Sequence, residues 1–290
     1  MALREEGDEF DPQACAAIAW AFATLGYHDA PLLEALSAPA IAQLRDCRTQ
    51  ELSNLAWSVA MLAFVNAPLL DAISAESLPK MGQFQTQHLT NTAWSFARLS
   101  VADAPLLAAI AAAAISRCCD VDVQGLANLV WAVAKLLLPH EPCLDAISAA
   151  ARAKIGEFTS QEMSNTVWSF ARLSRADEPL LDAIAAQAIR MISAFNMQEL
   201  SNTVLAYATL CKRDDPLSEA IAAAALSKMA SGVVDNQAPS NTAWGPGKLD
   251  RIRQPPSIAV QVQTASRIHG LVPQGSSNMA WLLTRSNRDG

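Results

Sequence analysis

Amide side chains and indole rings recur along this chain at a fixed spacing. The indole positions are 37 residues apart and comprise Trp20, Trp57, Trp94, Trp131 and Trp168, with Leu205 in the next place. A Gln stands seven residues before each of these positions and, from residue 54 onward, an Asn stands three residues before it. Amides donate and accept hydrogen bonds, and aromatic rings stack on flat groups. This combination indicates binding chemistry.

A helix that rotates about 100° per residue places the Gln, the Asn, the Trp and the residue eleven after the Gln within one face. The opposite face of the third unit carries Leu89, Thr92, Phe96 and Leu99, which we expect in the core. Ser95 and Ser169 extend the polar face. Stacked repeats would align these faces into one surface, which repeat proteins use to read single-stranded RNA. The candidate RNA contacts are Thr24, Met61, Arg98, Lys135, Arg172, Thr209, Gln87, Gln124 and Gln161.

The repeated Asn has two interpretations. It is the same in every unit from the second onward, whereas the position eleven after the Gln varies, and a residue that reads sequence should vary. An Asn inside a helix also needs a hydrogen-bond partner. We therefore expect a structural ladder between units, formed by Asn54, Asn91, Asn128, Asn165 and Asn202, with base contacts as the alternative.

The other elements of the pattern also leave alternatives open. The Gln is a candidate cap for the second helix of the preceding unit, and the Trp either packs between repeats or stacks on bases. Basic residues such as Lys80 and Arg117 end the second half of each unit, where they complement the helix dipole or contact phosphates.

Each unit has two halves with helical spacing of apolar residues and no alternating strand pattern. A Pro opens the second half, a tolerated place for Pro in a helix, and Thr49, Ser160 and Asn196 are candidate N-caps of the first. The sequence predicts an all-α fold, an α-solenoid of about six helix-pair repeats. We expect an N-terminal extension over residues 1–9, the array over 10–231, and Gly- and Pro-interrupted repeat remnants over 232–290. No polar capping helix is recognisable, which suggests part of a longer array.

Several classes of function find no support in the composition. There is no Gly-rich phosphate loop, catalytic motif or metal-ligand spacing, so we expect no enzyme, cofactor or metal site. No apolar stretch is long enough for a membrane span, and no transit peptide is visible. The net charge of −7 argues against nucleic-acid binding by bulk charge alone.

The repeat resembles the octotricopeptide repeat proteins of algae, and it is similar to the helical repeats of the FAST-kinase-like, RAP-domain family of organelle RNA factors. The resemblance covers about residues 10–231. In the third unit it is carried by Phe84, Gln87, Leu89, Asn91, Trp94, Ala97, Leu99 and Pro105. It implies sequence-selective RNA binding in the mitochondrial matrix or chloroplast stroma, for RNA processing, mRNA stability or translation.

We therefore expect an RNA-binding helical-repeat protein whose partners are single-stranded RNA and other RNA-processing proteins. The alternative is a protein-interaction scaffold of the HEAT or armadillo type, which the low isoelectric point favours. A third hypothesis is a repeat fragment that does not fold stably.

Overall fold

The computed structural model describes residues 12–230, which form α-helices joined by short turns and 3₁₀ segments. No strand occurs within this range, so the predicted all-α fold is confirmed there. The expectations for residues 1–9 and 232–290 lie outside the described residues. The α-helices are α1 (Pro12–Leu25), α2 (Ala30–Gln43), α3 (Thr49–Met61), α4 (Ala67–Ser77), α5 (Thr86–Arg98), α6 (Ala104–Ser116), α7 (Val123–Leu136), α8 (Glu141–Ala153), α9 (Ser160–Arg172), α10 (Glu178–Arg190), α11 (Met197–Thr209) and α12 (Asp215–Ala230). The 3₁₀ segments are η1 (Leu44–Asp46), η2 (Leu78–Gln83), η3 (Ile155–Glu157) and η4 (Ile192–Ala194).

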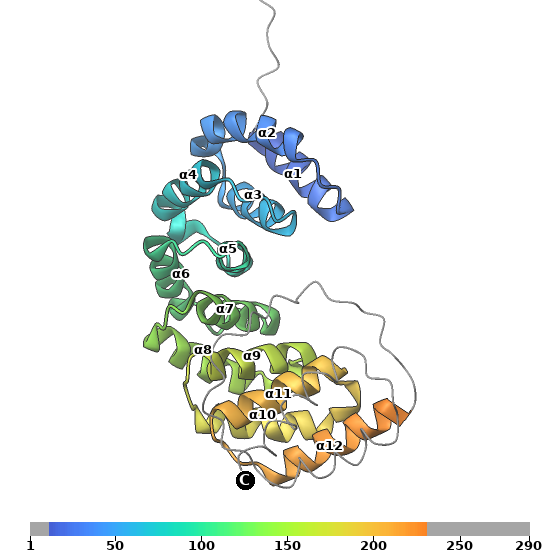
Figure 1. The fold of residues 1–290 in the computed structure, drawn as a ribbon. Helices are drawn as coiled ribbons and strands as arrows, with labels where there is room; N and C mark the ends of the chain where they lie inside the picture. The colour runs from blue at the N-terminus through green and yellow to red at the C-terminus, as the bar shows by residue number, and fades with distance from the viewer. Residues whose placement is uncertain (1–11, 231–290) are drawn as a thin grey trace, which may run out of the picture. The chain divides into compact units, whose positions relative to one another are not determined.

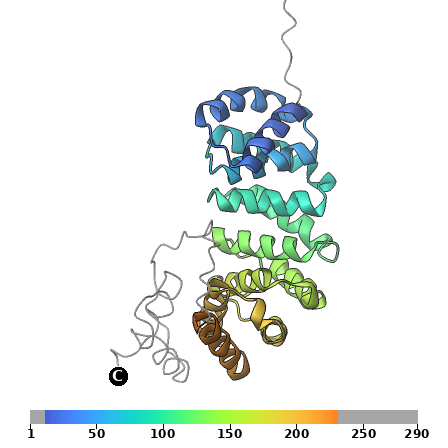
Figure 2. The ribbon, with the colours of Figure 1, turned by 90° about the vertical axis from the view of Figure 1, so that its right-hand side faces the viewer.

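The helices divide into two compact units, with the boundary between Ala150 and Ala151. In the first unit α1, α3, α5 and α7 lie side by side in one row, and α2, α4 and α6 form a second row beside it (Figure 1). Figure 2 shows α5 and α7 of this unit from the side. In the second unit α9 packs beside α11, and α10 beside α12. Each unit is therefore a stack of helix pairs, as expected for an α-solenoid.

The second helix of most pairs begins at an Asp or Asn that caps it. The cap oxygen accepts a hydrogen bond from the backbone N–H three residues later, at 2.9–3.1 Å. These caps are Asp29, Asn66, Asp103, Asp177 and Asp214. A Pro follows two residues after each cap, where no helical hydrogen bond is lost. The predicted helix starts are thus confirmed, with the acidic residues acting as caps.

Two of the three predicted N-caps of the first helices are displaced by one residue. The N-caps of α3 and α9 are Arg48 and Thr159, so Thr49 and Ser160 are the first helical residues instead. Asn196 is the N-cap of α11, as predicted. A Glu three residues after the cap accepts a hydrogen bond from the cap's backbone N–H in these three helices. In α9 and α11 the cap side chain also accepts from the N–H of that Glu, at 3.4 and 2.8 Å, which completes a capping box, whereas the guanidinium of Arg48 cannot accept a hydrogen bond.

Apolar side chains of both helices of a pair fill the core. Leu89, Thr92 and Phe96 are buried as predicted, whereas Leu99 is only partly buried because it follows the last residue of α5. Phe84 and Phe195, at the turns that lead into α5 and α11, are also fully buried. The first-row helices therefore present only their Gln/Asn face to solvent. None of the helices within residues 12–230 has the length and apolar character needed to cross a membrane.

The turn from the first to the second helix has the same geometry in every described repeat. One residue adopts a left-handed conformation, with φ between 51° and 64°. The next N–H bonds back to a carbonyl five residues earlier, as in Val101 N–H to Phe96 O at 2.9 Å, which defines a Schellman motif. Only Gly26 is a glycine at this position; the others are Ala63, Ser100, Leu137, Ser174 and Cys211.

Replacing one of these left-handed residues with glycine should stabilise the protein. A non-glycine residue in this conformation costs about 1–2 kcal/mol, and glycine's greater freedom in the unfolded chain offsets part of the gain. We expect Ser100→Gly to raise the free energy of unfolding by about 0.5–1 kcal/mol in a denaturant titration. The control is Ala112→Gly in the exposed middle of α6, which should cost about 1 kcal/mol. Equal destabilisation by both variants would contradict the assigned turn geometry.

Candidate functional site

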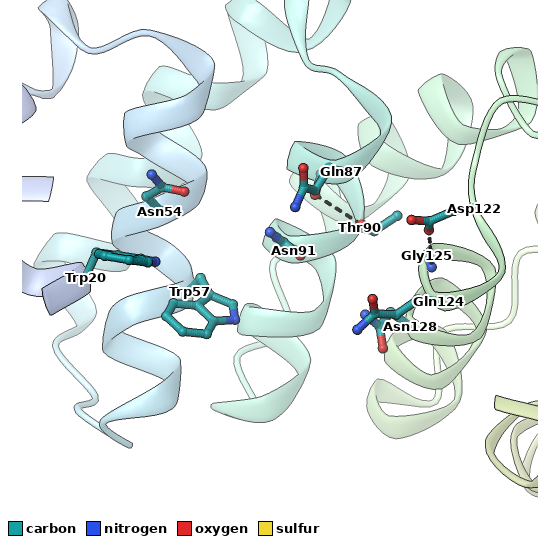
Figure 3. Close-up of a pocket in the computed structure, with 10 residues that line it drawn as sticks. All are labelled: Trp20, Asn54, Trp57, Gln87, Thr90, Asn91, Asp122, Gln124, Gly125 and Asn128. Carbon is teal, nitrogen blue, oxygen red and sulfur yellow. Dashed lines mark hydrogen bonds between the residues drawn. The ribbon is translucent and has the colours of Figure 1, made fainter. Parts of the chain in front are cut away.

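The first-row helices of the first unit line a polar groove. It has a volume of about 310 Å³ and takes residues from α1, α3, α5 and α7 and from the residue before α7 (Figure 3). Its lining comprises Trp20, Asn54, Trp57, Gln87, Thr90, Asn91, Asp122, Gln124, Gly125 and Asn128. The predicted amide and indole positions of successive repeats are therefore brought together, because equivalent helices lie side by side.

A second hollow continues the same face between α1 and α3. It has a volume of about 300 Å³ and shares Trp20 and Asn54 with the groove. Gln13 and Gln50, the Gln positions of the first two repeats, also line it. Four successive repeats thus contribute amides to one continuous face of the first unit, and the first two also contribute indoles.

The repeated Asn residues do not form the expected ladder. Their side chains are partly exposed, and none is hydrogen-bonded to another residue within the described part of the chain. Figure 3 shows the amides of Asn54, Asn91 and Asn128 at the groove. No hydrogen bond that would form the ladder expected for Asn54, Asn91, Asn128, Asn165 and Asn202 occurs within residues 12–230, and Asn54, Asn91 and Asn128 line the groove instead.

The candidate capping role of the Gln is not seen in the third, fourth and fifth repeats. Gln87, Gln124 and Gln161 are exposed, and their side chains form no hydrogen bond within residues 12–230. The serines four residues after the repeated Asn are buried instead of exposed. Ser95 and Ser169 each donate to the backbone carbonyl of that Asn at 2.6 Å. A hydroxyl in a helix readily bonds the carbonyl four residues earlier, which removes these serines from the polar face.

Basic residues connect successive repeats. Lys80 Nζ donates to the carbonyls of Leu44, Arg45 and Cys47, at 3.4, 2.7 and 2.8 Å, where the preceding repeat ends. Arg117 binds the carbonyls of Gly82 and Phe84 in the same manner, and Lys228 binds that of Ser193 at 3.1 Å. These cations cap the preceding repeat, so they are not available as phosphate contacts.

The position eleven after the Gln differs from repeat to repeat in structure as well as in sequence. Thr24 and Thr209 are exposed and donate to the backbone of their own helices. Met61 is 37% exposed. Arg98 and Arg172 place their guanidinium groups over Trp94 and Trp168, at 5.1 and 5.4 Å.

Three of the residues eleven after the Gln are cations, Arg98, Lys135 and Arg172, and Lys135 alone does not lie over an indole within the described residues. Arg98 also donates to the carbonyl of Ala60 at 2.9 Å, so it connects two repeats. Lys135 is partly buried and forms no ion pair or hydrogen bond within residues 12–230. The RNA-contact role of all six residues at this position stays a prediction.

Three lining residues were missed by the periodicity because they differ between repeats. Thr90, Asp122 and Gly125 gather where α5 meets α7 (Figure 3). Gly125 occupies the third position of α7. The corresponding residues of α3, α5, α9 and α11 are Glu51, His88, Glu162 and Glu199. The absence of a larger side chain at Gly125 was the one feature of the sequence that could have indicated this part of the groove. No group of three or more His, Cys, Asp or Glu side chains is arranged as metal ligands within the described residues.

The repeated indoles are partly buried and partly exposed at the surface. Trp57, Trp94, Trp131 and Trp168 are partly buried, and the rings of Trp94 and Trp131 lie 6.4 Å apart at 33°. Trp20 is 48% exposed. The packing interpretation and the stacking interpretation are therefore compatible, because Trp94 and Trp131 contact each other while all five indoles keep some exposed surface.

Stacked helix pairs whose first-row helices present amides and indoles define a helical-repeat protein. A family model described as RNA-editing substrate-binding complex 6 protein matches residues 5–153. This match spans half of the chain and includes every residue of the groove, and the chain belongs to this family. No curated protein matches the sequence. The resemblance to octotricopeptide and RAP-domain proteins stays a prediction.

Removing a connection between repeats should destabilise the fold. We expect Lys80→Ala to lower the free energy of unfolding by about 1–3 kcal/mol, because its hydrogen bonds to three carbonyls at the end of a repeat are lost. Arg45→Ala changes an exposed basic side chain on η1 and should stay within about 0.5 kcal/mol of the wild type. Thermal or denaturant unfolding measures both, and similar stabilities of the two variants would refute the connecting role of Lys80.

Proposed function

We propose that the chain binds single-stranded RNA along the groove of its first unit, as a subunit of an RNA-editing or related RNA-processing complex. The observation that carries this proposal is the row of amides at the groove that have no side-chain hydrogen bond within residues 12–230: Asn54, Gln87, Asn91, Gln124 and Asn128. Splayed single-stranded bases offer both donors and acceptors on their edges, and an amide complements either. The family to which the chain belongs supports an RNA-related role.

The charges of the first unit favour contacts with bases over contacts with phosphates. Lys80 and Arg117 bind backbone carbonyls, and Arg48 pairs with Glu51 at 2.7 Å. The lining of the groove contains one charged side chain, the carboxylate of Asp122. Hydrogen bonds and stacking on indoles therefore supply most of the proposed affinity. This resolves the conflict between an acidic chain and an RNA ligand.

The proposed role is binding without catalysis. The groove offers amides, indoles, one hydroxyl and one carboxylate. General acid–base chemistry needs a proton donor and acceptor poised at one point, and this lining does not suggest such a pair. Metal and cofactor chemistry are likewise not part of the proposal.

The proposed compartment is the mitochondrial matrix, since the repeat resembles organelle RNA factors and the family name refers to RNA editing. The chloroplast stroma has support only from the repeat resemblance. Within the organelle, RNA processing, mRNA stability and translation are the candidate roles. A groove with no cation among the described residues that line it gives modest affinity for RNA by itself, and partner proteins in a complex would add to it through avidity.

Substituting the groove amides should weaken RNA binding without unfolding the protein. We expect Asn91→Ala combined with Asn128→Ala to reduce affinity for a single-stranded RNA pool roughly tenfold, since each lost hydrogen bond is worth about 0.5–1.5 kcal/mol. The melting temperature should stay near that of the wild type, because neither side chain has a partner within the described fold.

The matched control is Gln83→Ala, which removes an exposed amide on η2, outside the groove lining. Fluorescence anisotropy with labelled RNA measures all three proteins. A loss of stability in the Asn variant would restore the ladder interpretation. Absence of binding to any RNA by the wild type, with tight binding of a peptide, would favour the scaffold alternative.

The salt dependence of RNA binding should be shallow. One or two phosphate contacts predict a log–log slope of about −0.7 to −1.4 on a single strand. Lys135→Gln should reduce the slope by about 0.7, because Lys135 is the first-row cation of this unit without an ion pair or hydrogen bond within the described residues. Arg45→Gln is the control and should leave the slope unchanged. A steep slope that survives Lys135→Gln would show that phosphates are bound elsewhere.

A further inference from the structure

One end of the groove differs chemically from the rest. Asp122 precedes α7, and its Oδ1 accepts a hydrogen bond from the backbone N–H of Gly125 at 2.7 Å. The side chain is exposed, and its other oxygen has no hydrogen-bond or ion-pair partner within residues 12–230. The carboxylate therefore retains a free acceptor at the groove.

The carboxylates at the starts of the other first-row helices are engaged by the protein. Glu51 accepts from the backbone N–H of Arg48 at 2.6 Å and pairs with its guanidinium group. Glu162 accepts from the N–H and hydroxyl of Thr159, and Glu199 accepts from the N–H of Asn196 at 2.8 Å. Because Gly125 replaces the Glu in the fourth repeat, no capping box forms there, and Asp122 alone caps the helix.

The glycine also sets the shape of this end of the groove. A Cβ at residue 125 would lie 2.7 Å from Val121 Cγ1, 2.8 Å from Asp122 Oδ1 and 3.0 Å from Thr90 Cγ2. Any larger side chain would displace the carboxylate or Thr90. Gly125 thus allows α7 to approach Thr90 of α5 while Asp122 keeps its hydrogen bond to the Gly125 N–H (Figure 3).

Amides flank this carboxylate on both sides. Gln87 and Asn91 extend from α5, and Gln124 and Asn128 extend from α7 (Figure 3). The volume of about 310 Å³ lies at the lower end of the range for small-ligand pockets. Acceptors and donors therefore surround a space in which one acceptor carries a full negative charge.

We propose that this end of the groove binds an amine-bearing base and disfavours uracil, with Asp122 as the residue that determines the specificity. The proposal rests on the proposed RNA-binding function. The free oxygen of Asp122 accepts from an exocyclic amine such as N4 of cytosine, a pairing that carboxylates form with this base. Uracil presents a carbonyl at the same position, and two acceptors repel each other. The flanking amides can rotate to suit either base, so they do not discriminate.

The test compares short oligo(C) and oligo(U) RNAs, whose bases are of equal size but differ at C4, which bears an amine in cytosine and a carbonyl in uracil, and at N3, which is an acceptor in cytosine and a donor in uracil. Wild-type protein should bind oligo(C) roughly tenfold more tightly than oligo(U). Asp122→Asn keeps a capping residue at the start of α7, because Asn and Asp cap equally well, but it replaces the anionic acceptor with a rotatable amide. The preference should fall to about twofold or less.

Asp103→Asn is the matched control, since Asp103 caps α6 through the same hydrogen bond, at 2.9 Å, and does not line the groove. It should keep the wild-type preference. Asp122→Ser is a second capping substitution and should behave like Asp122→Asn. Equal binding of the two RNAs by wild type, or an unchanged preference in both Asp122 variants, would overturn the specificity role and leave RNA binding intact. Binding of neither RNA nor of any mixed-sequence RNA would instead remove the proposed function itself.

Discussion

Every α-helix ends in carbonyl groups that have no partner inside the helix, and in this chain the next repeat supplies a partner. Lys80 and Arg117 extend from one repeat to the last carbonyls of the repeat before it, and Lys228 does the same in the second unit. These bonds neutralise the negative end of a helix dipole and fix the spacing of neighbouring repeats. The alignment of the first-row helices, and with it the groove, depends on that spacing.

This use of cations has a chemical consequence for the groove. Basic side chains that would ordinarily attract a polyanion are engaged by the backbone, and what remains on the first-row face is largely uncharged. Such a face distinguishes ligands by the pattern of donors and acceptors and by flat surfaces available for stacking. An acidic chain and an RNA ligand are compatible under these conditions, provided that bases and not phosphates supply most of the contacts.

The periodicity of the sequence predicted the helix pairs, their stacking and the residues that share the groove, because one pattern of apolar and polar positions recurs in each repeat. It did not predict which polar groups find partners. Asn128 looked structural because it is invariant between repeats, whereas the reach of Lys80 to three carbonyls depends on the distance between repeats, which no spacing within a repeat reveals. Asp122 and Gly125 were missed because they break the repeat, and a search for regularity passes over such positions.

The amides at the groove have a property that a carboxylate lacks. Rotation of a primary amide by half a turn exchanges its donor and its acceptor without changing its shape. A row of amides with no fixed partner is therefore a surface whose hydrogen-bonding pattern is set by whatever lies against it. Such a surface accepts many patterns of donors and acceptors. A single carboxylate remains an acceptor in every orientation, so it can fix the register of a bound chain along the groove.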